Sequence, residues 1–393
     1  MRVLFISHED ADFGAPKAMF ELILNLKNNY DVEPIVLLHS DDNIKKLCDK
    51  VEIENYVVGH RNCISKKNRS IKGYIHFCLK KIVYNLSRII ALHRIKKNID
   101  MKSIDIIHTN VSIIDLGIDL HKIYGIPNIL HLREPGTIIN EYKFCRKRYI
   151  ELINKNCICN IAISNAIKEQ WIENGIRESN IKVIYDGVNI PKMPITKFRY
   201  TDKKVHIVMC GSISKQKGQH QLIEAVRLLP INYKNLLKIH FIGKGDKKYI
   251  NKIKSNIVSY KLNDIFIFEG YKKNISEILP YFDIGVSCSK FEPFGRVTVE
   301  YMLAKLCVIA SNTGASPEII DDNQNGFLYR YNNYKDLAQK IRYVIDNKNL
   351  KINIGNLARK KVIDNFSMDI HSRNIYRLYE RILNEGVYNE TRI

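Results

Sequence analysis

The stretch DIGVSCSKFEPFGRVTVEYMLAK, residues 283–305, places a strand, a turn and a helix in direct succession. The run DIGVSCS is rich in small and apolar residues, which is typical of a buried strand. Pro293 disfavours a helical conformation at Glu292, and Gly295 permits a sharp turn. From Arg296 the pattern RVTVEYMLAK is typical of a helix. The stretch therefore predicts one strand-and-helix unit of a parallel sheet.

The same alternation of short apolar strands and helical patterns runs along the chain on both sides of this unit. We predict strands at residues 3–7, 32–38, 51–58, 103–109, 128–132, 159–164 and 182–186, and then at 205–211, 238–243, 265–270, 283–289 and 307–312. Such alternation indicates parallel sheets that are covered by helices on both faces. Residues 189–204 interrupt it with two prolines and a polar, charged run, which is typical of an interdomain linker.

The fold class that we expect is α/β, with two doubly wound parallel-sheet domains of the Rossmann-like type. The length of 393 residues and the hydrophobic content of 45% suit two cores. The expected domains are residues 1–188 and 205–367, and the helical stretch 368–385 can pack back on the first of them. Ligands of open parallel sheets bind at the carboxyl ends of the strands, so two facing sheets should line a shared cleft.

Cysteine usage and the absence of an export signal favour a cytoplasmic protein. The nine cysteines include no CxxC pair, which indicates reduced thiols and no metal site. The chain opens with MRVLFIS, which predicts a strand and not a signal peptide. We find no apolar run of the length that spans a bilayer, although contact with the inner membrane leaflet remains compatible with the sequence.

Two basic clusters lie in the N-terminal half of this chain, whose net formal charge is +21. Residues 55–99 contain no acidic residue and carry Arg61, Lys66, Lys67, Arg69, Lys72, Lys80, Lys81, Arg88, Arg94, Lys96 and Lys97. A second basic cluster consists of Lys143, Arg146, Lys147 and Arg148. A basic face of this kind attracts polyanions, whether nucleic acid, anionic lipid or a phosphorylated substrate.

The amphipathic segment 75–97 within this basic region has two interpretations. Six apolar residues share a stripe on the predicted helix: Ile75, Leu79, Ile82, Leu86, Ile89 and Ile90. The favoured interpretation places the stripe against the core and leaves a solvated cationic face. The alternative is a surface that meets anionic lipid headgroups.

Glycine turns follow three of the predicted strands in the second domain. GSISKQKG, residues 211–218, combines a glycine after a strand, the cation of Lys217 and the start of a helix, which together suit a diphosphate. It does not match the P-loop, because Lys217 precedes its glycine and Gln219 follows it. An ordinary turn with solvated lysines is an equally good interpretation. The turns at Gly243 and Tyr271 are, taken alone, simple strand-to-helix connections.

Glu292 and Glu300 lie on either side of the predicted start of a helix. The first falls in the loop after a strand, and the second lies about one turn into the helix. An anion at the helix N-terminus, helped by Arg296, would leave each carboxylate to hold a pair of hydroxyl groups. That arrangement suits a nucleoside diphosphate sugar. Two unrelated surface glutamates with an accidental spacing are the alternative, to which the spacing alone gives equal weight.

The E-x7-E pattern of Glu292 and Glu300 resembles the hallmark of family 4 retaining glycosyltransferases, also called group 1, which have the two-domain GT-B fold. The likeness covers most of the chain, in the expected order and spacing. It includes GAPKAMFELI (14–23), DIIHTN (105–110), IPNILHLRE (126–134), AIS (162–164), VIYDGV (183–188), GSISKQKGQ (211–219), FIGKGD (241–246), FEGY (268–271), EPFGRVTVEYM (292–302), VIASNTGASPEII (308–320) and NGFLY (325–329).

The resemblance implies transfer of a sugar, with retention of configuration, from a nucleotide-diphosphate sugar. A UDP-sugar is favoured as donor, and a glycan or lipid-linked molecule of cell-surface polysaccharide synthesis is favoured as acceptor. The family generally needs no metal ion, so we expect none, and we expect no cofactor besides the donor. Similar enzymes are thought to use front-face attack, in which the leaving phosphate takes the acceptor's proton. Glu292 need not then be a covalent nucleophile.

The resemblance also assigns roles by position. Glu300 would hold the ribose hydroxyls, Glu292 the hydroxyls of the donor sugar, and Lys217 the diphosphate. Lys217, Arg296 and the helix N-terminus would stabilise the leaving group as its charge develops. The implied donor contacts also include Gly14 from the first domain, Gly211, Ser212, Gly243, Tyr271, Phe294, Gly295, Arg296 and Val297.

Two positions depart from the family pattern. Ser212 stands where the family often has an arginine, so Lys215 or Arg296 would supply that charge. Arg133 and the glutamate after it stand where the family often has a His–Asp pair, and His131 lies two residues earlier. We expect a catalytic contact with the donor sugar from His131 or Arg133, and the resemblance leaves open which of the two makes it.

Two other classes of function compete with a glycosyltransferase. The positive charge is compatible with a nucleic-acid-binding protein, but it is not interleaved with an aromatic stacking platform or a recognised module, so no nucleic acid is expected as partner. Another activity on the same fold, such as a sugar-nucleotide epimerase or a phosphorylase, is the second alternative.

Overall fold

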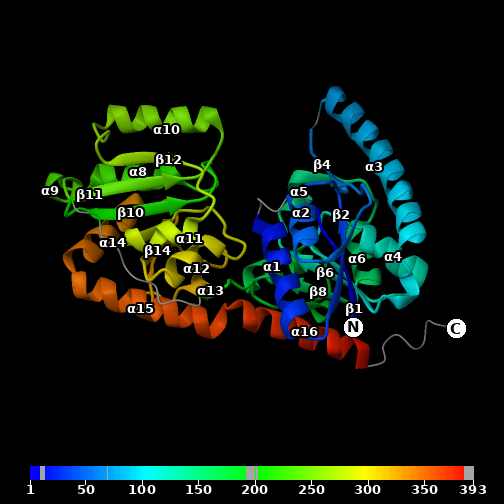
Figure 1. Ribbon diagram of the computed structural model, residues 1–393. Helices are drawn as coiled ribbons and strands as arrows, with labels where there is room; N and C mark the ends of the chain where they lie inside the picture. Colours follow the sequence, from blue (N-terminus) through cyan, green and yellow to red (C-terminus); the bar gives the residue numbers. More distant parts are fainter. Residues whose placement is uncertain (9–13, 69, 192–199, 201, 385–393) are drawn as a thin grey trace. The chain divides into compact units, whose positions relative to one another are not determined.

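The computed structural model describes residues 1–8, 14–68, 70–191, 200 and 202–384 and is shown in Figure 1. The chain forms two compact units. Unit 1 consists of residues 1–187 together with the segment from Met368 onward, and unit 2 consists of residues 188–367. Most of the predicted linker, residues 189–204, lies outside the described residues.

Unit 1 contains a seven-stranded parallel sheet in the order β3-β2-β1-β5-β6-β8-β9. The apolar side chains of β1 and β5 are fully buried, as expected for a sheet covered on both faces. Its strands are β1 (Arg2–Ile6), β2 (Glu33–Leu38), β3 (Glu54–Val57), β5 (Ile106–Thr109), β6 (Asn128–Leu132), β8 (Cys159–Ala162) and β9 (Ile181–Val183). Two further strands, β4 (Ile64–Lys66) and β7 (Tyr142–Phe144), form a separate antiparallel pair.

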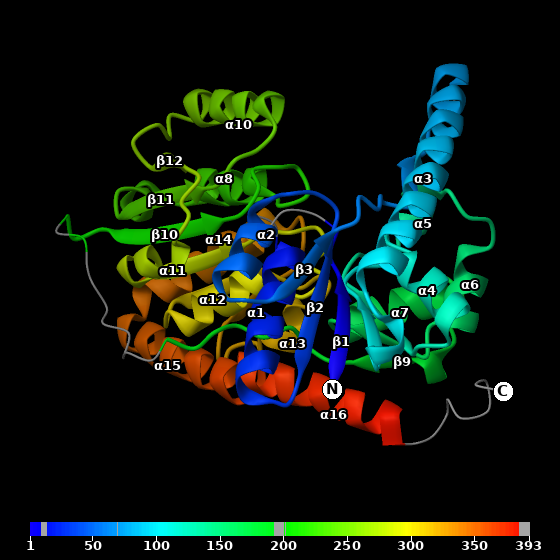
Figure 2. The same ribbon diagram turned by 45° about the vertical axis from the view of Figure 1, so that its right-hand side comes forward.

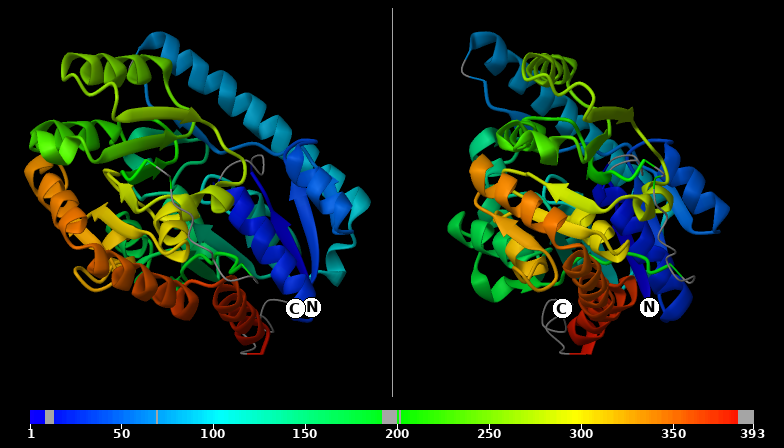
Figure 3. Two further views of the ribbon diagram at one scale, coloured as in Figure 1. Left: turned by 60° about the vertical axis from the view of Figure 1, so that its left-hand side comes forward. Right: turned by 90° about the vertical axis from the view of Figure 1, so that its left-hand side faces the viewer.

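The helices of unit 1 include one from the C-terminal end of the chain. They are α1 (Gly14–Asn29), α2 (Asn43–Lys50), α3 (Ile71–Asn98), α4 (Leu116–Tyr124), α5 (Ile138–Glu141), α6 (Tyr149–Asn156), α7 (Asn165–Glu173) and α16 (Met368–Asn384), with short 3₁₀ turns at Met101–Ser103 and Glu178–Asn180. Helix α16 runs alongside α1, as Figure 3 shows. Ser372 donates to Asn25 at 2.6 Å, and the rings of Tyr30 and Tyr376 lie 4.7 Å apart.

The structure contradicts the favoured interpretation of the amphipathic segment. The six residues of the predicted stripe lie on α3, and each is between 48 and 62% exposed. The residues of α3 that are buried are Tyr84, Ser87, Ala91 and Ile95, which lie on another face of the helix. The apolar stripe therefore faces outward, and a helix face of smaller and more polar residues packs on the unit.

Unit 2 contains a six-stranded parallel sheet in the order β12-β11-β10-β13-β14-β15. Its strands are β10 (Val205–Cys210), β11 (Leu237–Ile242), β12 (Phe266–Gly270), β13 (Ile284–Ser287), β14 (Cys307–Ser311) and β15 (Phe327–Tyr329). The helices are α8 (Gln219–Leu228), α9 (Ile231–Lys234), α10 (Lys247–Ser259), α11 (Ile275–Ile278), α12 (Arg296–Leu303), α13 (Ser316–Ile319), α14 (Tyr334–Asp346) and α15 (Lys348–Asn365), with a 3₁₀ turn at Leu279–Tyr281.

Residues 283–305 form the strand-and-helix unit that the sequence predicts. Strand β13 is buried along its whole length, and α12 begins at Arg296. The strand order reverses between β10 and β13, because β10 pairs with β11 on one side and with β13 on the other. Ligands of open α/β sheets bind at such a switch point, outside the carboxyl ends of the strands. The predicted α/β class with two parallel sheets is thus confirmed.

Candidate active site

Four loops meet at the carboxyl edge of the unit 2 sheet. Backbone hydrogen bonds of 2.8 Å join them: Ile213 N to Lys244 O, Lys290 N to Gln216 O, and Ala315 N to Glu292 O. These bonds connect the loop after β10 with the loops after β11 and β13, and the β13 loop with the loop after β14. The two loops next to the switch point, those after β10 and β13, are therefore fixed to each other and to their neighbours.

The loop after β10 contacts the loop after β11 through two glycines. A Cβ atom on Gly243 would lie 1.9 Å from the carbonyl oxygen of Gly211, so no larger residue fits there without moving the backbone. A Cβ atom on Gly211 itself would have no atom within 4 Å. The backbone at Gly211 thus borders open space at the end of β10. This geometry lets a ligand come close to the main chain.

Lys217 and Glu292 form an ion pair at this edge. The Nζ atom of Lys217 lies 3.1 and 2.8 Å from the two carboxylate oxygens of Glu292. Ser289 donates its hydroxyl proton to the same carboxylate at 2.7 Å. The side chain of Glu292 is only 13% exposed and that of Lys217 is 32% exposed. A cation and an anion are therefore held side by side, partly shielded from water, beside the switch point.

The backbone of Glu292 is held from the β14 side. Ser311 and Thr313 donate hydroxyl protons to the carbonyl oxygen of Ser289 at 2.7 and 2.8 Å. Gly314 has a φ of +56°, and a Cβ atom there would lie 2.3 Å from the carbonyl oxygen of Glu292. The loop after β14 can approach Glu292 this closely only because residue 314 has no side chain.

Replacing Gly314 with alanine is expected to destabilise unit 2 and to displace Glu292. The left-handed backbone costs an alanine about 1–2 kcal/mol, and the collision with Glu292 should bring the total loss to about 4 kcal/mol. Gly270→Ala is the matched control, because Gly270 has a φ of +70° and open space at its Cβ position. Urea unfolding followed by circular dichroism measures both variants. If Gly314→Ala and Gly270→Ala lose the same free energy of unfolding, the close contact with Glu292 contributes nothing to stability.

Helix α12 presents Arg296 and Glu300 at the same edge. Gly295 is its N-cap, and the Nε atom of Arg296 lies 3.5 Å from a carboxylate oxygen of Glu300. Tyr301, the next residue, is fully buried and accepts a hydrogen bond from the backbone N–H of Cys210. Burial raises the pKa of Tyr301 well above its usual value, so its hydroxyl stays protonated. Tyr301 thereby fixes α12 to the end of β10.

The other predicted donor contacts in unit 2 differ in how their side chains lie. Phe294 is buried and its ring lies 5.8 Å from that of Phe366, so only its backbone is available at the edge. Ser212 is exposed, and its carbonyl accepts from Gln219 at 3.0 Å. Tyr271 is exposed, and Lys244 lies 5.0 Å from the centre of its ring. Val297 lies half-buried in the first turn of α12.

In unit 1, His131 and Arg133 lie at the end of β6 in a buried polar cluster. His131 is fully buried, its Nδ1 lies 3.0 Å from Nε2 of His108, and burial lowers its pKa well below the usual value. Arg133 forms a buried ion pair with Asp186 at 2.7 Å, and its Nε donates to Asn110 at 3.0 Å. The contact of His131 or Arg133 with a donor sugar stays a prediction.

Gly14, the remaining predicted contact, is the first residue of α1. A Cβ atom there would have nothing within 4 Å. Residues 9–13 of the preceding loop lie outside the described residues. Its predicted approach to the diphosphate also stays a prediction.

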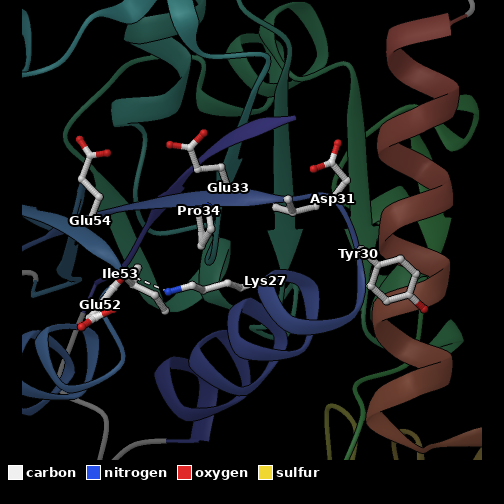
Figure 4. Close-up of a pocket in the computed structure, with 9 residues that line it drawn as sticks. Lys27, Tyr30, Asp31, Glu33, Pro34, Glu52, Ile53 and Glu54 are labelled. Carbon is white, nitrogen blue, oxygen red and sulfur yellow. Dashed lines mark hydrogen bonds between the residues drawn. The ribbon is translucent and has the colours of Figure 1, made fainter.

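A pocket in unit 1 lies at the opposite edge of its sheet, where β2 and β3 begin (Figure 4). Its one lysine, Lys27, donates to the carbonyl oxygens of Val51 and Glu52, each at 2.8 Å. Four acidic residues also line the pocket: Asp31, Glu33, Glu52 and Glu54. Because it lies at the amino ends of the strands and its cation is already bound, we do not place the active site there.

Two family models match this chain, one in each half. The model described as "Glycosyltransferase Family 4" matches residues 46–191, and the model described as "Glycosyl transferases group 1" matches residues 195–361. The chain belongs to the group 1 glycosyltransferases. Lys217 and Glu292 in their loops and Glu300 on α12 of this glycosyltransferase all lie within the second match.

Relatives of this glycosyltransferase extend over most of its length. An uncharacterized glycosyltransferase of Methanocaldococcus jannaschii is 28% identical over 356 residues, which cover 88% of this chain and 94% of the relative. Poly(ribitol-phosphate) alpha-N-acetylglucosaminyltransferase of Staphylococcus aureus is 30% identical over 250 residues, or 63% of this chain and 48% of the relative.

A solved structure confirms the predicted GT-B fold of the glycosyltransferase. Anabaena HepE, crystallised with UDP and glucose, matches it with a TM-score of 0.74 at 21% identity. The match covers 97% of this chain and 99% of HepE.

Several residues that shape the candidate site of this glycosyltransferase were not predicted. Ser289, Gly314 and Tyr301 hold Glu292 and α12 in place, and Asp186 pairs with Arg133. Gly285 gives one signal that was available. A glycine inside an apolar strand often marks a close approach, and a Cβ atom there would lie 2.4 Å from the ring of Tyr301.

Proposed function

We propose that this glycosyltransferase transfers a sugar from a UDP-sugar, with retention of configuration, to a glycan or lipid-linked acceptor in cell-surface polysaccharide synthesis. The observation that carries the proposal is the Lys217–Glu292 pair in the loops next to the switch point of the unit 2 sheet, with Glu300 on the helix that follows the β13 loop. The S. aureus relative is named for transfer of N-acetylglucosamine to poly(ribitol phosphate), and HepE was crystallised with UDP and glucose. Both names support the proposed donor and acceptor classes.

The donor would be held by groups of opposite charge along its length. Glu300 takes the ribose hydroxyls, and the diphosphate lies at the N-terminus of α12 near Lys217 and Arg296. Glu292 takes hydroxyls of the sugar. Donor binding breaks the Lys217–Glu292 ion pair. The lysine then pairs with the diphosphate, and the carboxylate accepts hydrogen bonds from the sugar hydroxyls. The bond from Ser289 keeps the carboxylate in position during this exchange.

In the reaction, the bond between the anomeric carbon and the β-phosphate oxygen breaks while the acceptor hydroxyl attacks from the same face of the sugar. The acceptor's proton passes to the leaving phosphate. Lys217, Arg296 and the first N–H groups of α12 stabilise the negative charge that develops on the diphosphate. Glu292 forms no covalent bond to the sugar in this mechanism. Because side chains and amides supply the positive charge, we expect transfer to proceed in the presence of a chelator.

A thermal-shift screen of nucleotide sugars in EDTA tests the proposal. A donor that binds only the folded state, at a concentration of a hundred times its Kd, stabilises that state by about 2.7 kcal/mol. For a unit of this size, that corresponds to a rise in melting temperature of about 5–10 °C. We expect UDP-sugars to give the largest rise, and proton NMR of the transfer product to show the donor's anomeric configuration. A melting temperature that rises with DNA and with no nucleotide sugar would instead support a nucleic-acid-binding protein.

A further inference from the structure

Helix α3 carries a continuous apolar stripe on its outward face. Nine large apolar residues of this helix are between 44 and 81% exposed: Ile71, Tyr74, Ile75, Leu79, Ile82, Val83, Leu86, Ile89 and Ile90. We call them the α3 stripe. Single exposed apolar residues are ordinary in proteins, but a contiguous set of this size marks a surface that binds something.

The spacing of the α3 stripe places it opposite the packed face of the helix. At 3.6 residues per turn its members cover about half of the circumference, and the buried residues Tyr84, Ser87, Ala91 and Ile95 lie on the other half. From residue 71 to residue 90 the stripe extends about 30 Å along the axis. Figure 2 shows this long helix, coloured light blue, with its first turns extending beyond α4.

Polar contacts on the packed face fix this orientation. Arg88 donates to Asp119 of α4, with one N···O distance of 3.1 Å. The hydroxyl of Tyr84 donates to the carboxylate of Asp115, which is the N-cap residue of α4. These contacts orient α3 so that its apolar side chains point outward. The exposure of the stripe therefore follows from specific contacts on the opposite face of the helix.

The charges along α3 identify what can cover the stripe. Residues 55–99 contain no carboxylate, whereas five lysines lie on the helix: Lys72, Lys80, Lys81, Lys96 and Lys97. Lys143 of the neighbouring strand β7 lies 5.5 Å from the centre of the Phe77 ring. A second copy of this helix would bring lysines against lysines. An anionic bilayer supplies both the apolar phase and the negative charge that this surface lacks.

We propose that α3 lies flat on an anionic lipid bilayer, with the α3 stripe inserted among the headgroups and its lysines at the phosphates. Helices that bind in this way combine an apolar face with a lysine-rich polar face. In the part of the chain that the structure describes, no helix has the length and apolar character that a membrane span requires. The inference rests on the surface of α3 alone and needs neither a donor nor an acceptor.

Flotation of the full chain with vesicles tests this inference. We expect it to float with phosphatidylcholine vesicles that contain about 30% phosphatidylglycerol, less with pure phosphatidylcholine, and less at high than at low salt. The double variant Leu79→Ser/Ile82→Ser should lower the partition coefficient about tenfold or more. The matched control is Ile231→Ser/Val258→Ser, which changes two residues of unit 2 that are 70 and 62% exposed.

A second pair of variants tests whether the lysines of α3 contribute to binding anionic vesicles. Lys80→Gln/Lys81→Gln should weaken flotation on anionic vesicles severalfold, since each basic residue near such a surface adds attraction. Lys247→Gln/Lys248→Gln, on the exposed start of α10, is its control and should float like the wild type. Trp171, the single tryptophan of the chain, is fully buried in unit 1, so its fluorescence during heating shows whether each unit 1 variant is folded.

Two outcomes would overturn the inference. One is flotation that the Leu79→Ser/Ile82→Ser variant leaves unchanged. The other is a dimer that forms without lipid, is lost in this variant and does not float, which would assign the stripe to a second copy of the chain. Sedimentation equilibrium at several protein concentrations measures that dimer. Neither outcome depends on sugar transfer, so the proposed function would stand or fall separately.

Discussion

Replacing Lys217 with alanine is expected to lower kcat/KM for sugar transfer at least about a hundredfold, or about 2.7 kcal/mol of transition-state stabilisation. Lys217 lies in the loop between β10 and α8, and its Nζ atom is 2.8 Å from Glu292. As the bond to the sugar breaks, negative charge grows on the diphosphate, and this ammonium group is placed to meet it. Because that charge is larger in the transition state than in the bound donor, kcat should fall more than KM rises.

Initial rates at varied donor concentration measure the Lys217→Ala effect. Lys335→Ala is the control, because Lys335 is exposed on α14 and its loss removes one positive charge from unit 2 away from the site. The alanine variant also leaves Glu292 without its cation, so Lys217→Arg should recover part of the activity if charge at this position is what matters. Unchanged kcat/KM in Lys217→Ala would remove the residue from the mechanism.

Replacing Glu300 with glutamine is expected to weaken UDP binding about ten- to a hundredfold. A hydrogen bond to a charged group contributes about 1.5–3 kcal/mol, and the neutral amide loses the charge that strengthens bonds from two ribose hydroxyls. Arg296, whose Nε lies 3.5 Å from Glu300, also loses its carboxylate partner in this variant. Because ribose does not react, KM for the donor should rise more than kcat falls.

Calorimetric titration with UDP measures the Glu300→Gln effect. Glu277→Gln, an exposed position on α11, makes the same chemical change at a residue for which no donor contact is predicted and should bind UDP like the wild type. The two site variants are thus expected to differ in their kinetics. Lys217→Ala mainly lowers kcat, whereas Glu300→Gln mainly raises KM for the donor. Equal UDP affinity in Glu300→Gln and the wild type would place the ribose elsewhere.

The fold was predictable because its signals are local. Strand β13 follows from the run DIGVSCS, and the start of α12 follows from Pro293 and Gly295 just before it. Each of these signals needs only neighbouring residues. The same holds for the carboxyl-edge position of Glu292 and Glu300, because a parallel sheet sends the end of every strand to one side.

The orientation of α3 was not predictable from its own residues. The helix has an apolar stripe and a polar face, and either can turn inward. Asp115 binds Tyr84 and Asp119 binds Arg88, and each aspartate follows its partner by about 30 positions in the chain. The sequence around the aspartates gives no indication of these pairs, because they are not neighbours on one helix. A hydrophobic pattern therefore identified the helix correctly, while the face that it buries was set by distant charged groups.

The supports of the candidate site are also long-range. Gly314 contacts Glu292 from the next strand's loop, and Asp186 meets Arg133 from more than fifty residues away. Nothing beside either residue in the sequence marks the contact. Glu292 and Glu300 look, by composition alone, like an acid–base pair. In the structure each carboxylate instead has a different cation beside it, Lys217 for Glu292 and Arg296 for Glu300. The proposed function accordingly gives each a separate contact, one with the sugar and one with the ribose.

The most direct test of the central claim is calorimetric titration of the full chain with a UDP-sugar in EDTA. The account predicts one binding site in the wild type, retained without divalent metal, weakened at least about tenfold in Glu300→Gln and weakened less than that in Lys217→Ala. A wild type that binds no nucleotide sugar, or two variants that bind it as tightly as the wild type, would contradict the claim that the carboxyl edge of unit 2 holds the donor.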